Sequence, residues 1–167
     1  MQIFFNIVGF LKNETFSFFL LIRRRYSNYK FMKKSNASIS LDANPTGGWE
    51  GSFVGENTRI NSKFNLRNKN GNVYIGANCL IASRVTIIIN KYDTNQEEIS
   101  IKNMKFANVK INDNVLIGTG AVIMPGVEIG HGAVIGANSV VIKNVQPFSI
   151  VAGLPAKHIA FRKLNEK

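Results

Sequence analysis

The chain is poor in side chains that carry acid–base or nucleophilic chemistry. Its 167 residues include one cysteine, Cys79, and two histidines, His131 and His158. These three cannot build the usual zinc cluster, so we expect no metal site. Cys79 occupies a small-residue position of a repeat, which favours a buried thiol over a reactive one. His131 lies at a repeat corner and His158 in the tail, and we interpret both as surface or corner residues.

Residues 88–108 are therefore the first place to look for chemistry. They interrupt an otherwise regular repeat with the sequence IINKYDTNQEEISIKNMKFAN, which includes Tyr92 and Asp93. A long excursion from a tight scaffold is where binding and catalytic groups concentrate. The regular elements on both sides must then hold this loop in place.

Those elements repeat with a period of six residues. Between residues 111 and 145 an aliphatic residue recurs at every sixth position, and the residue four places later is always Val, Ala or Ser. The aliphatic positions are Ile111, Ile117, Ile123, Ile129, Ile135 and Val141. A helix needs apolar spacing near 3.6 residues and an ordinary strand near 2. A period of six instead indicates short strands joined by Gly, Asn or Asp corners, which stack into a parallel β-helix.

Earlier hexads follow the same pattern and set the size of the β-helix. They begin at Val54, Ile60, Leu66, Ile75, Ile81 and Ile87, with a small insertion at residues 68–72. Three hexads close one triangular coil, so the whole set predicts about four coils. We expect an N-terminal helical and basic segment at residues 1–38 and a β-helix at 39–155, which starts with a loop at 41–51. A basic tail follows at 156–167.

The net charge of +11 is concentrated near the N-terminus. Residues 1–35 contain seven Lys and Arg against Glu14 alone, but no nucleic-acid-binding motif accompanies them, so we expect no nucleic acid partner. The apolar run of the first 31 residues is broken at residues 12–14 and is too short to span a membrane. Two interpretations remain open: a helix that covers the open end of the β-helix, and a peripheral membrane contact through Arg23, Arg24 and Arg25.

The run VLIGTGAVIMPGVEIGHGAVIGANSVVIKNV, followed by SIVAGLPAKHI, resembles the hexapeptide-repeat acetyltransferases. The resemblance covers about residues 54–162 and is strongest to the branch that contains sugar O-acetyltransferases and the capsule and O-antigen acetyltransferases. It implies a left-handed parallel β-helix and a homotrimer. It also implies that acetyl-CoA lies in a groove between two adjacent subunits, with no metal.

The same resemblance assigns roles to individual residues. Tyr92 stands where the family has its catalytic histidine, Asn61 at the acceptor-contacting Asn, and Asp93 beside Tyr92. The positions that correspond to cofactor binding are Gly118, Thr119, Ala137, Lys143, Lys157 and Arg162. The family's Thr before the lysine is Ile142 here, and its tail arginine falls on Ala160, two places before Arg162.

Tyr92 changes what the loop can do, because a phenol is almost entirely protonated near neutral pH and is a poor general base. Three explanations stay open. The acceptor is a sugar amine that needs positioning more than deprotonation. Alternatively, Asp93 or another loop residue of a neighbouring subunit replaces the histidine. In the third explanation, catalysis has been lost.

The sequence therefore predicts an acetyl-CoA-dependent acyltransferase of surface polysaccharide biosynthesis. Its acceptor would be a hydroxyl or amine of a sugar, nucleotide-sugar or oligosaccharide. We expect it in the cytoplasm, at the inner face of the membrane if the N-terminal segment binds lipid. The alternative is a catalytically impaired trimeric protein with a structural or regulatory role.

Overall fold

The computed structural model describes residues 37–40, 43–46, 51–67, 72–95, 97–98 and 100–164. The expected N-terminal helical segment lies almost wholly outside the described residues, as do most of the insertion at 68–72 and much of the loop at 41–51. The prediction for the N-terminal segment therefore stays a prediction. Among the described residues, no helix has the length and apolar character needed to cross a membrane.

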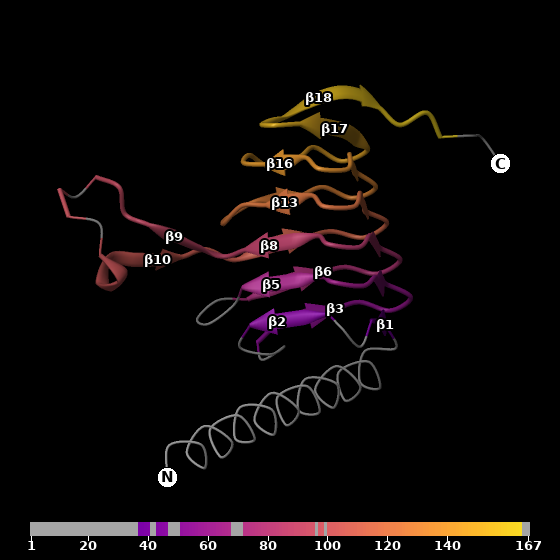
Figure 1. Ribbon diagram of the computed structural model, residues 1–167. Coiled ribbons are helices and arrows are strands. Elements are labelled where there is room, and N and C mark those ends of the chain that lie inside the picture. The colour runs from indigo at the N-terminus through magenta and orange to yellow at the C-terminus, as the bar shows by residue number, and fades with distance from the viewer. Residues whose placement is uncertain are drawn as a thin grey trace, which may run out of the picture.

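The β-helix of the described chain has three sheets, which we name A, B and C, and all neighbouring strands in them are parallel except the last pair of sheet A (Figure 1). Sheet A contains β1 (Ser38–Ile39), β4 (Arg59–Ile60), β7 (Leu80–Ile81), β12 (Leu116–Ile117), β15 (Val134–Ile135), β17 (Ser149–Gly153) and β18 (Ala156–Phe161). Sheet B contains β2 (Asn44–Thr46), β5 (Asn65–Arg67), β8 (Thr86–Ile88), β13 (Val122–Ile123) and β16 (Val140–Val141). Sheet C contains β3 (Phe53–Val54), β6 (Val73–Ile75), β11 (Val109–Ile111) and β14 (Glu128–Ile129).

Successive strands pass from sheet A to B to C and then return to A one level higher. Within the described residues this gives four complete coils, and β15 and β16 begin a fifth, which reaches sheet C at a bridge between Val145 and Ile129. The prediction of a left-handed parallel β-helix of about four coils is confirmed. The first coil begins at Ser38, earlier than the first hexad that the sequence pattern reveals at Val54.

The inward residue of each short strand stacks on the inward residue of the coil below. In sheet A, backbone pairing places Ile60, Ile81, Ile117 and Ile135 in one column, and all four side chains are buried. Equivalent columns run through Leu66, Ile87, Ile123 and Val141 in sheet B, and through Val54, Ile75, Ile111 and Ile129 in sheet C. No single coil could bury these side chains alone, so the core exists only in the stack.

The corners have a repeating backbone conformation. The fourth residue of the hexads has positive φ at Asn57, Lys63, Asn78, Arg84, Asn114, Gly120, Gly126, Gly132 and Asn138. Asn and Gly reach this left-handed region at low cost, as the sequence pattern predicts. Lys63 and Arg84 are departures from that expectation, since a side chain without a short polar group is disfavoured there.

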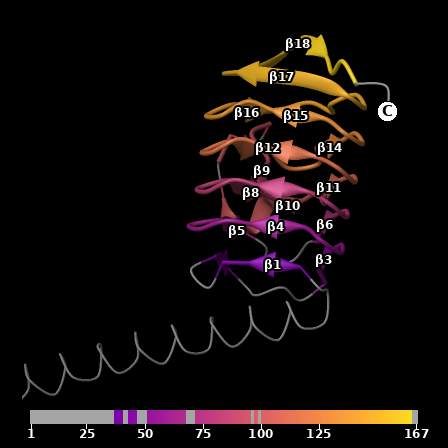
Figure 2. The ribbon, with the colours of Figure 1, turned by 90° about the vertical axis from the view of Figure 1, so that its right-hand side faces the viewer.

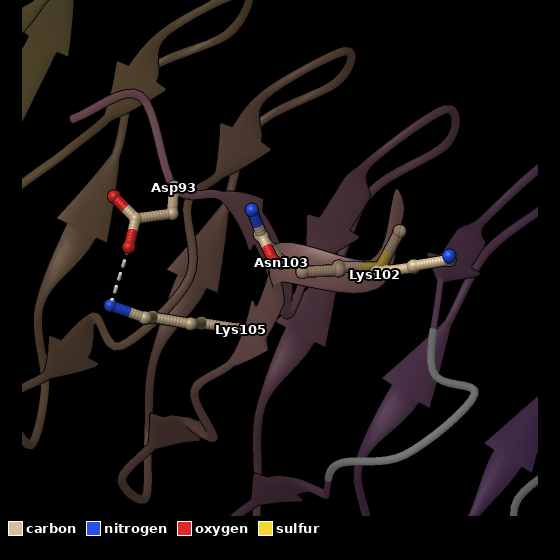
Figure 3. Close-up of a pocket in the computed structure, with 5 residues that line it drawn as sticks. Asp93, Lys102, Asn103 and Lys105 are labelled. Atoms are coloured by element: carbon tan, nitrogen blue, oxygen red, sulfur yellow. Dashed lines mark ion pairs between the residues drawn. The ribbon is translucent and has the colours of Figure 1, made fainter. Parts of the chain in front are cut away.

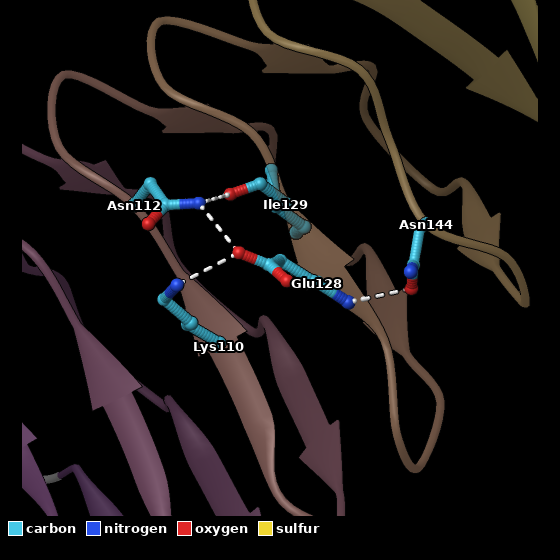
Figure 4. Close-up of polar contacts among 5 residues, drawn as sticks. All are labelled: Lys110, Asn112, Glu128, Ile129 and Asn144. Atoms are coloured by element: carbon cyan, nitrogen blue, oxygen red, sulfur yellow. Dashed lines mark hydrogen bonds and ion pairs between the residues drawn. The ribbon is translucent and has the colours of Figure 1, made fainter.

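A polar ladder ties three coils together on the outer face of sheet C (Figure 4). Lys110 Nζ lies 2.8 Å from Glu128 Oε1, and Asn112 Nδ2 donates to the same oxygen at 3.1 Å. These two contacts, with Lys110 first, hold the pKa of Glu128 below its ordinary value. The backbone N–H of Glu128 donates in turn to Asn144 Oδ1 at 2.9 Å. This network links β11 and β14 to the corner after β16.

Candidate active site

The segment between β8 and β11 forms a protruding hairpin on an otherwise regular β-helix (Figure 1). Its strands are β9 (Asn90–Tyr92) and β10 (Met104–Phe106), which pair antiparallel and follow the corner between sheets B and C. The 3-10 turn η1 (Ile101–Asn103) leads into β10. β11 nevertheless pairs with β6 in register, so the excursion does not disturb the third coil.

Tyr92 faces Met104 across this hairpin, and its side chain is 44% exposed. The next pair on the same face, two residues away along each strand, is Asn90 with Phe106, whose ring is also exposed. Side chains alternate between the two faces of a strand pair. Tyr92, Met104 and Phe106 therefore form an apolar surface on one face of the hairpin, and Lys91 and Lys105 lie on the other.

Asp93 directly follows β9 and forms an ion pair with Lys105, whose Nζ lies 2.8 Å from Asp93 Oδ2 (Figure 3). Asp93 Oδ1 also accepts the backbone N–H of Asn95 at 3.1 Å. The hydrogen bond from Lys105, followed by that from Asn95, holds the pKa of Asp93 below its ordinary value. A carboxylate so stabilised is a weaker base than a free one, and the ion pair ties the two hairpin strands together.

A pocket of about 330 Å³ opens beside this ion pair. Its lining residues are Asp93, Lys102, Asn103, Met104 and Lys105 (Figure 3). The interrupted repeat predicts that this loop carries function, but nothing in the sequence singles out Lys102, Asn103 or Lys105. Only the apolar–basic–aromatic alternation of residues 104–106 signals a strand there, and three residues are too few for a firm period-2 assignment.

The predicted acceptor and cofactor residues gather at a different place, the corner between sheets A and B, which we name the AB edge. Asn61 follows β4, while Gly118 and Thr119 follow β12, two coils higher. Ala137 lies at the same corner one coil above Thr119, since Asn138 N–H donates to the Thr119 carbonyl at 2.9 Å. The left-hand edge of the ribbon in Figure 2, where the strands of sheet A end, shows this column of corners.

Glycine at position 118 lets two coils approach closely at the AB edge. A Cβ at Gly118 would lie 2.5 Å from the backbone nitrogen of Ala137. Within the described residues, the backbone N–H groups of Thr119 and Ala137 donate to no protein acceptor. Each of these two coils therefore presents an N–H donor at the open edge, where an acyl or amide oxygen of a ligand can accept a hydrogen bond.

The remaining predicted cofactor residues are spread over all three edges. Lys157 is exposed and pairs with Ala152 on β17, near the AB edge. Lys143 follows β16 at the edge between sheets B and C, on the hairpin side. Arg162 lies at the edge between sheets C and A, where its Nη1 donates to the Gly132 carbonyl at 2.9 Å.

One chain therefore does not bring all of its predicted site residues together. Asn61, Gly118, Thr119 and Ala137 lie at the AB edge, whereas Tyr92 and Asp93 project from the opposite edge of sheet B. The strands of sheet B separate the two groups. The order of the hexads already predicts this separation of the two groups, because every third hexad returns to the same sheet. Ile60 and Ile117 belong to one sheet, and the hairpin follows Ile87 of the next.

The two histidines have structural contacts. His158 Nδ1 lies 2.6 Å from Ser149 Oγ, and Ser149 is buried beneath β18. The ring of His131 packs edge-on against Phe148, with centroids 5.3 Å apart. Cys79 is buried, and burial is the main cause that raises the pKa of its thiol. Within the described residues, no group of three or more His, Cys, Asp or Glu side chains is placed to hold a metal ion.

Comparisons with known proteins agree with this architecture. Residues 108–143 match the family model described as bacterial transferase hexapeptide (six repeats). The chain is 39% identical over 95 residues to galactoside O-acetyltransferase of Escherichia coli K12, which covers 57% of this chain and 46% of that protein. It is 51% identical over 63 residues to a chloramphenicol acetyltransferase of Klebsiella aerogenes, which covers 38% and 30% of the two chains. The alignments thus span less than half of either relative.

Solved structures extend the likeness to the fold. A hexapeptide-repeat acetyltransferase of Vibrio cholerae, solved in complex with acetyl coenzyme A, superposes with a TM-score of 0.69 at 25% identity. The superposition covers 77% of this chain and 69% of that one. The chain is a hexapeptide-repeat protein whose repeats and left-handed β-helix are similar to those of the hexapeptide-repeat acetyltransferases.

Proposed function

We propose that the protein is an acetyl-CoA-dependent acetyltransferase that modifies a hydroxyl or amine of a sugar in surface polysaccharide biosynthesis. The observation that carries this proposal is the AB edge of the upper coils, where Thr119 and Ala137 each present an N–H that no described acceptor binds, beside closely packed backbone. A thioester or pantetheine amide needs such preorganised donors. The similarity to acetyltransferases, one of them solved with acetyl-CoA, supports the same assignment.

The chemistry transfers an acetyl group from sulfur to oxygen or nitrogen. The acceptor atom forms a bond to the thioester carbonyl carbon, negative charge builds on the carbonyl oxygen, and the bond to sulfur then breaks. Backbone N–H groups of the AB edge would stabilise the oxygen. The acceptor proton needs a base, and neither the phenol of Tyr92 nor Asp93, bound by Lys105, is a strong one. An amine acceptor, part of which is neutral, places the smallest demand on that base.

We further propose a homotrimer in the cytoplasm, with the hairpin of one subunit meeting the AB edge of the next. The separation of Tyr92 from Asn61 and Ala137 across sheet B supports this arrangement, because a site that uses both groups needs two copies of the chain. The apolar hairpin surface of Tyr92, Met104 and Phe106 offers a contact for a neighbouring subunit. Peripheral contact with the membrane through the N-terminal segment is part of the same proposal.

Subunit complementation tests the shared site. Tyr92→Ala would damage the hairpin, and Ala137→Glu, at an exposed corner, would block the edge and repel CoA phosphates. If the two variants are each inactive and are refolded together at equal amounts, random mixing pairs an intact hairpin with an intact edge at about one quarter of the sites. Recovery near that fraction supports the intersubunit site. No recovery in trimers shown to be mixed would refute it.

Cofactor binding tests the transferase assignment itself. CoA should raise the melting temperature of the wild type, because a ligand that binds only the native state stabilises it. The Ala137→Glu variant should lose this shift, while Tyr92→Ala should keep it. A wild-type protein that shows no stabilisation at millimolar CoA would rule out the proposed activity.

Tyr92 stands where the resemblance places a catalytic histidine, and this favours a second candidate. The candidate is a trimeric protein with a structural or regulatory role and impaired catalysis. Among the described residues, the Tyr92 hydroxyl has no hydrogen-bond partner that could take its proton. Wild type and Tyr92→His would be compared on amino sugars and on hydroxyl acceptors. Transfer to amines by the wild type supports the enzyme, whereas hydroxyl transfer that appears only in the histidine variant supports the impaired protein.

A further inference from the structure

Two cations occupy corners of the AB edge where the repeat otherwise uses Asn or Gly. Lys63 has φ of 55° and Arg84 has φ of 61°, and both are exposed. The other left-handed corners between Asn57 and Asn138 hold only Asn or Gly in the described part of the chain. A long side chain gains nothing from this backbone conformation. Residues held in disfavoured conformations concentrate at functional sites, so these two cations call for a functional explanation.

The two cations lie at stacked corners of adjacent coils, next to Ser62 and Ser83, and we name these four residues the cluster. The backbone N–H of Arg84 donates to the Ser62 carbonyl at 3.0 Å, which stacks the two corners directly. Ser62 and Ser83 directly precede the two cations in the sequence, and their Oγ atoms lie 3.0 Å apart. Asn61 precedes Ser62 on the same edge, where its N–H donates to the Ile81 carbonyl at 2.9 Å. The edge therefore gathers two positive charges, two hydroxyls and one amide.

Neither cation has an acidic partner among the described residues. The ion pairs found there join Lys105 to Asp93 and Lys110 to Glu128, so no described acidic side chain neutralises Lys63 or Arg84. Guanidinium, ammonium and hydroxyl groups together make good donors for phosphate or carboxylate oxygens. The cluster thus has the composition of an anion-binding site and lies open to solvent.

The height of the cluster on the β-helix indicates which ligand it meets. Arg84 lies in the third coil, the same coil from which the Tyr92 hairpin projects, and Lys63 lies one coil lower. Thr119 and Ala137, the proposed acetyl-CoA donors, lie in the two coils above. If subunits are related by an axis parallel to the β-helix, a neighbour's hairpin reaches the AB edge at the height of Arg84. The cations then lie on the acceptor side of the thioester.

We propose that Lys63 and Arg84, with Ser62 and Ser83, form an anion subsite for the acetyl acceptor, so that the acceptor carries a phosphate or carboxylate group. This inference rests on the proposed function, since it takes acetyl-CoA to occupy the upper AB edge. A nucleotide-linked sugar would supply phosphate, and an acidic sugar would supply carboxylate. Both offer the same oxygen acceptors to the cluster.

The test measures thermal stabilisation by two anionic probes, dTDP and D-glucuronate, with CoA held at saturation so that its own site is filled. Maltose serves as the neutral probe. The variants are Lys63→Asn and Arg84→Asn, which install the residue that other corners use at the same φ and should therefore fold. Lys163→Asn removes one charge from an exposed position outside the cluster and is the matched control.

We expect at least one anionic probe to stabilise the wild type and maltose to have no effect. Each cluster variant should weaken the affinity for that probe about tenfold, and Lys163→Asn should leave it unchanged. A response to dTDP alone indicates a phosphate-bearing acceptor, and a response to glucuronate alone indicates a carboxylate.

Three outcomes would overturn the assignment. If CoA stabilises the wild type but neither anion does, the anion subsite is wrong while the proposed function stands. If Lys63→Asn and Arg84→Asn lose stabilisation by CoA itself, the cations bind the cofactor and not the acceptor. If CoA has no effect on the wild type, the proposed function fails, and the acceptor assignment fails with it.

Discussion

The substitution Gly118→Ala should destabilise the protein through a steric clash between coils at the AB edge. The new Cβ would lie 2.5 Å from Ala137 N, and reaching an ordinary contact of 3.4 Å requires a shift of about 0.9 Å. The upper coil resists this shift because the Gly118 N–H donates to the Ile135 carbonyl at 2.8 Å on one side of the corner. The bond from Asn138 N–H to the Thr119 carbonyl, at 2.9 Å, holds the other side.

Overpacking costs about 1–3 kcal/mol, and a weakened hydrogen bond adds about 1 kcal/mol, so we expect a loss of about 2–4 kcal/mol. Gly126→Ala is the matched control. Its φ of +81° makes alanine unfavourable, by about 1–2 kcal/mol, but its Cβ would only touch Ala107 Cβ at 3.4 Å.

Urea denaturation followed by circular dichroism, at one protein concentration, gives both free energies of unfolding. The steric argument requires Gly118→Ala to lose more stability than Gly126→Ala. A smaller loss, or one within about 0.5 kcal/mol of the wild type, would show that the coils can separate at this edge and would refute the argument.

Three further predictions follow from the core, the hairpin and the corners. Ile117→Ala should lower the free energy of unfolding by about 2–5 kcal/mol in urea and Ile117→Val by about 1 kcal/mol, since Ile117 is fully buried; equal losses would contradict ladder packing. Because the folded-state pKa of Asp93 is lowered, its ion pair with Lys105 should stabilise the hairpin above pH 3.8 and weaken as the pH falls through the lowered pKa. An NMR titration of the Asp93 carboxyl checks this, and a midpoint at or above 3.8 would disprove it. Lys63→Asn should raise the free energy of unfolding in urea by about 0.5–1 kcal/mol, because Asn tolerates the left-handed corner. A lower free energy than that of the wild type would mean that the lysine makes a structural contact.

The sequence predicted the inward residues and the corners well, because the six-residue period leaves one register open. Ile111 to Ile135 could not shift by one position without exposing every aliphatic side chain. The first coil was harder to find. Its strand Asn44–Thr46 contains Asn and Pro, residues that indicate a turn, and its pairing with Asn65–Arg67 depends on a neighbour far along the chain.

The predicted site residues could be placed only in part. Asn61, Gly118, Thr119 and Ala137 share an edge that counting hexads in threes would have revealed. The hairpin geometry could not be predicted, since two strands of three residues show too little alternation. Residues 156–161 of the predicted basic tail form β18, which pairs antiparallel with β17 around Gly153 and Ala156. Only long-range pairing decides that arrangement.

The stacking of coils has a consequence for any elongated ligand along the AB edge. Neighbouring strands in a sheet lie about 4.8 Å apart, so corners on successive coils are spaced by that distance. From Arg84 to Ala137 is a rise of two coils, or about 10 Å. Ile117 pairs with Ile135, so one coil without an insertion takes 18 residues. The β-helix therefore presents its ligand contacts at a fixed spacing of one coil. A longer or shorter ligand can be accommodated only by the gain or loss of a whole coil, whereas its chemistry can change one corner at a time.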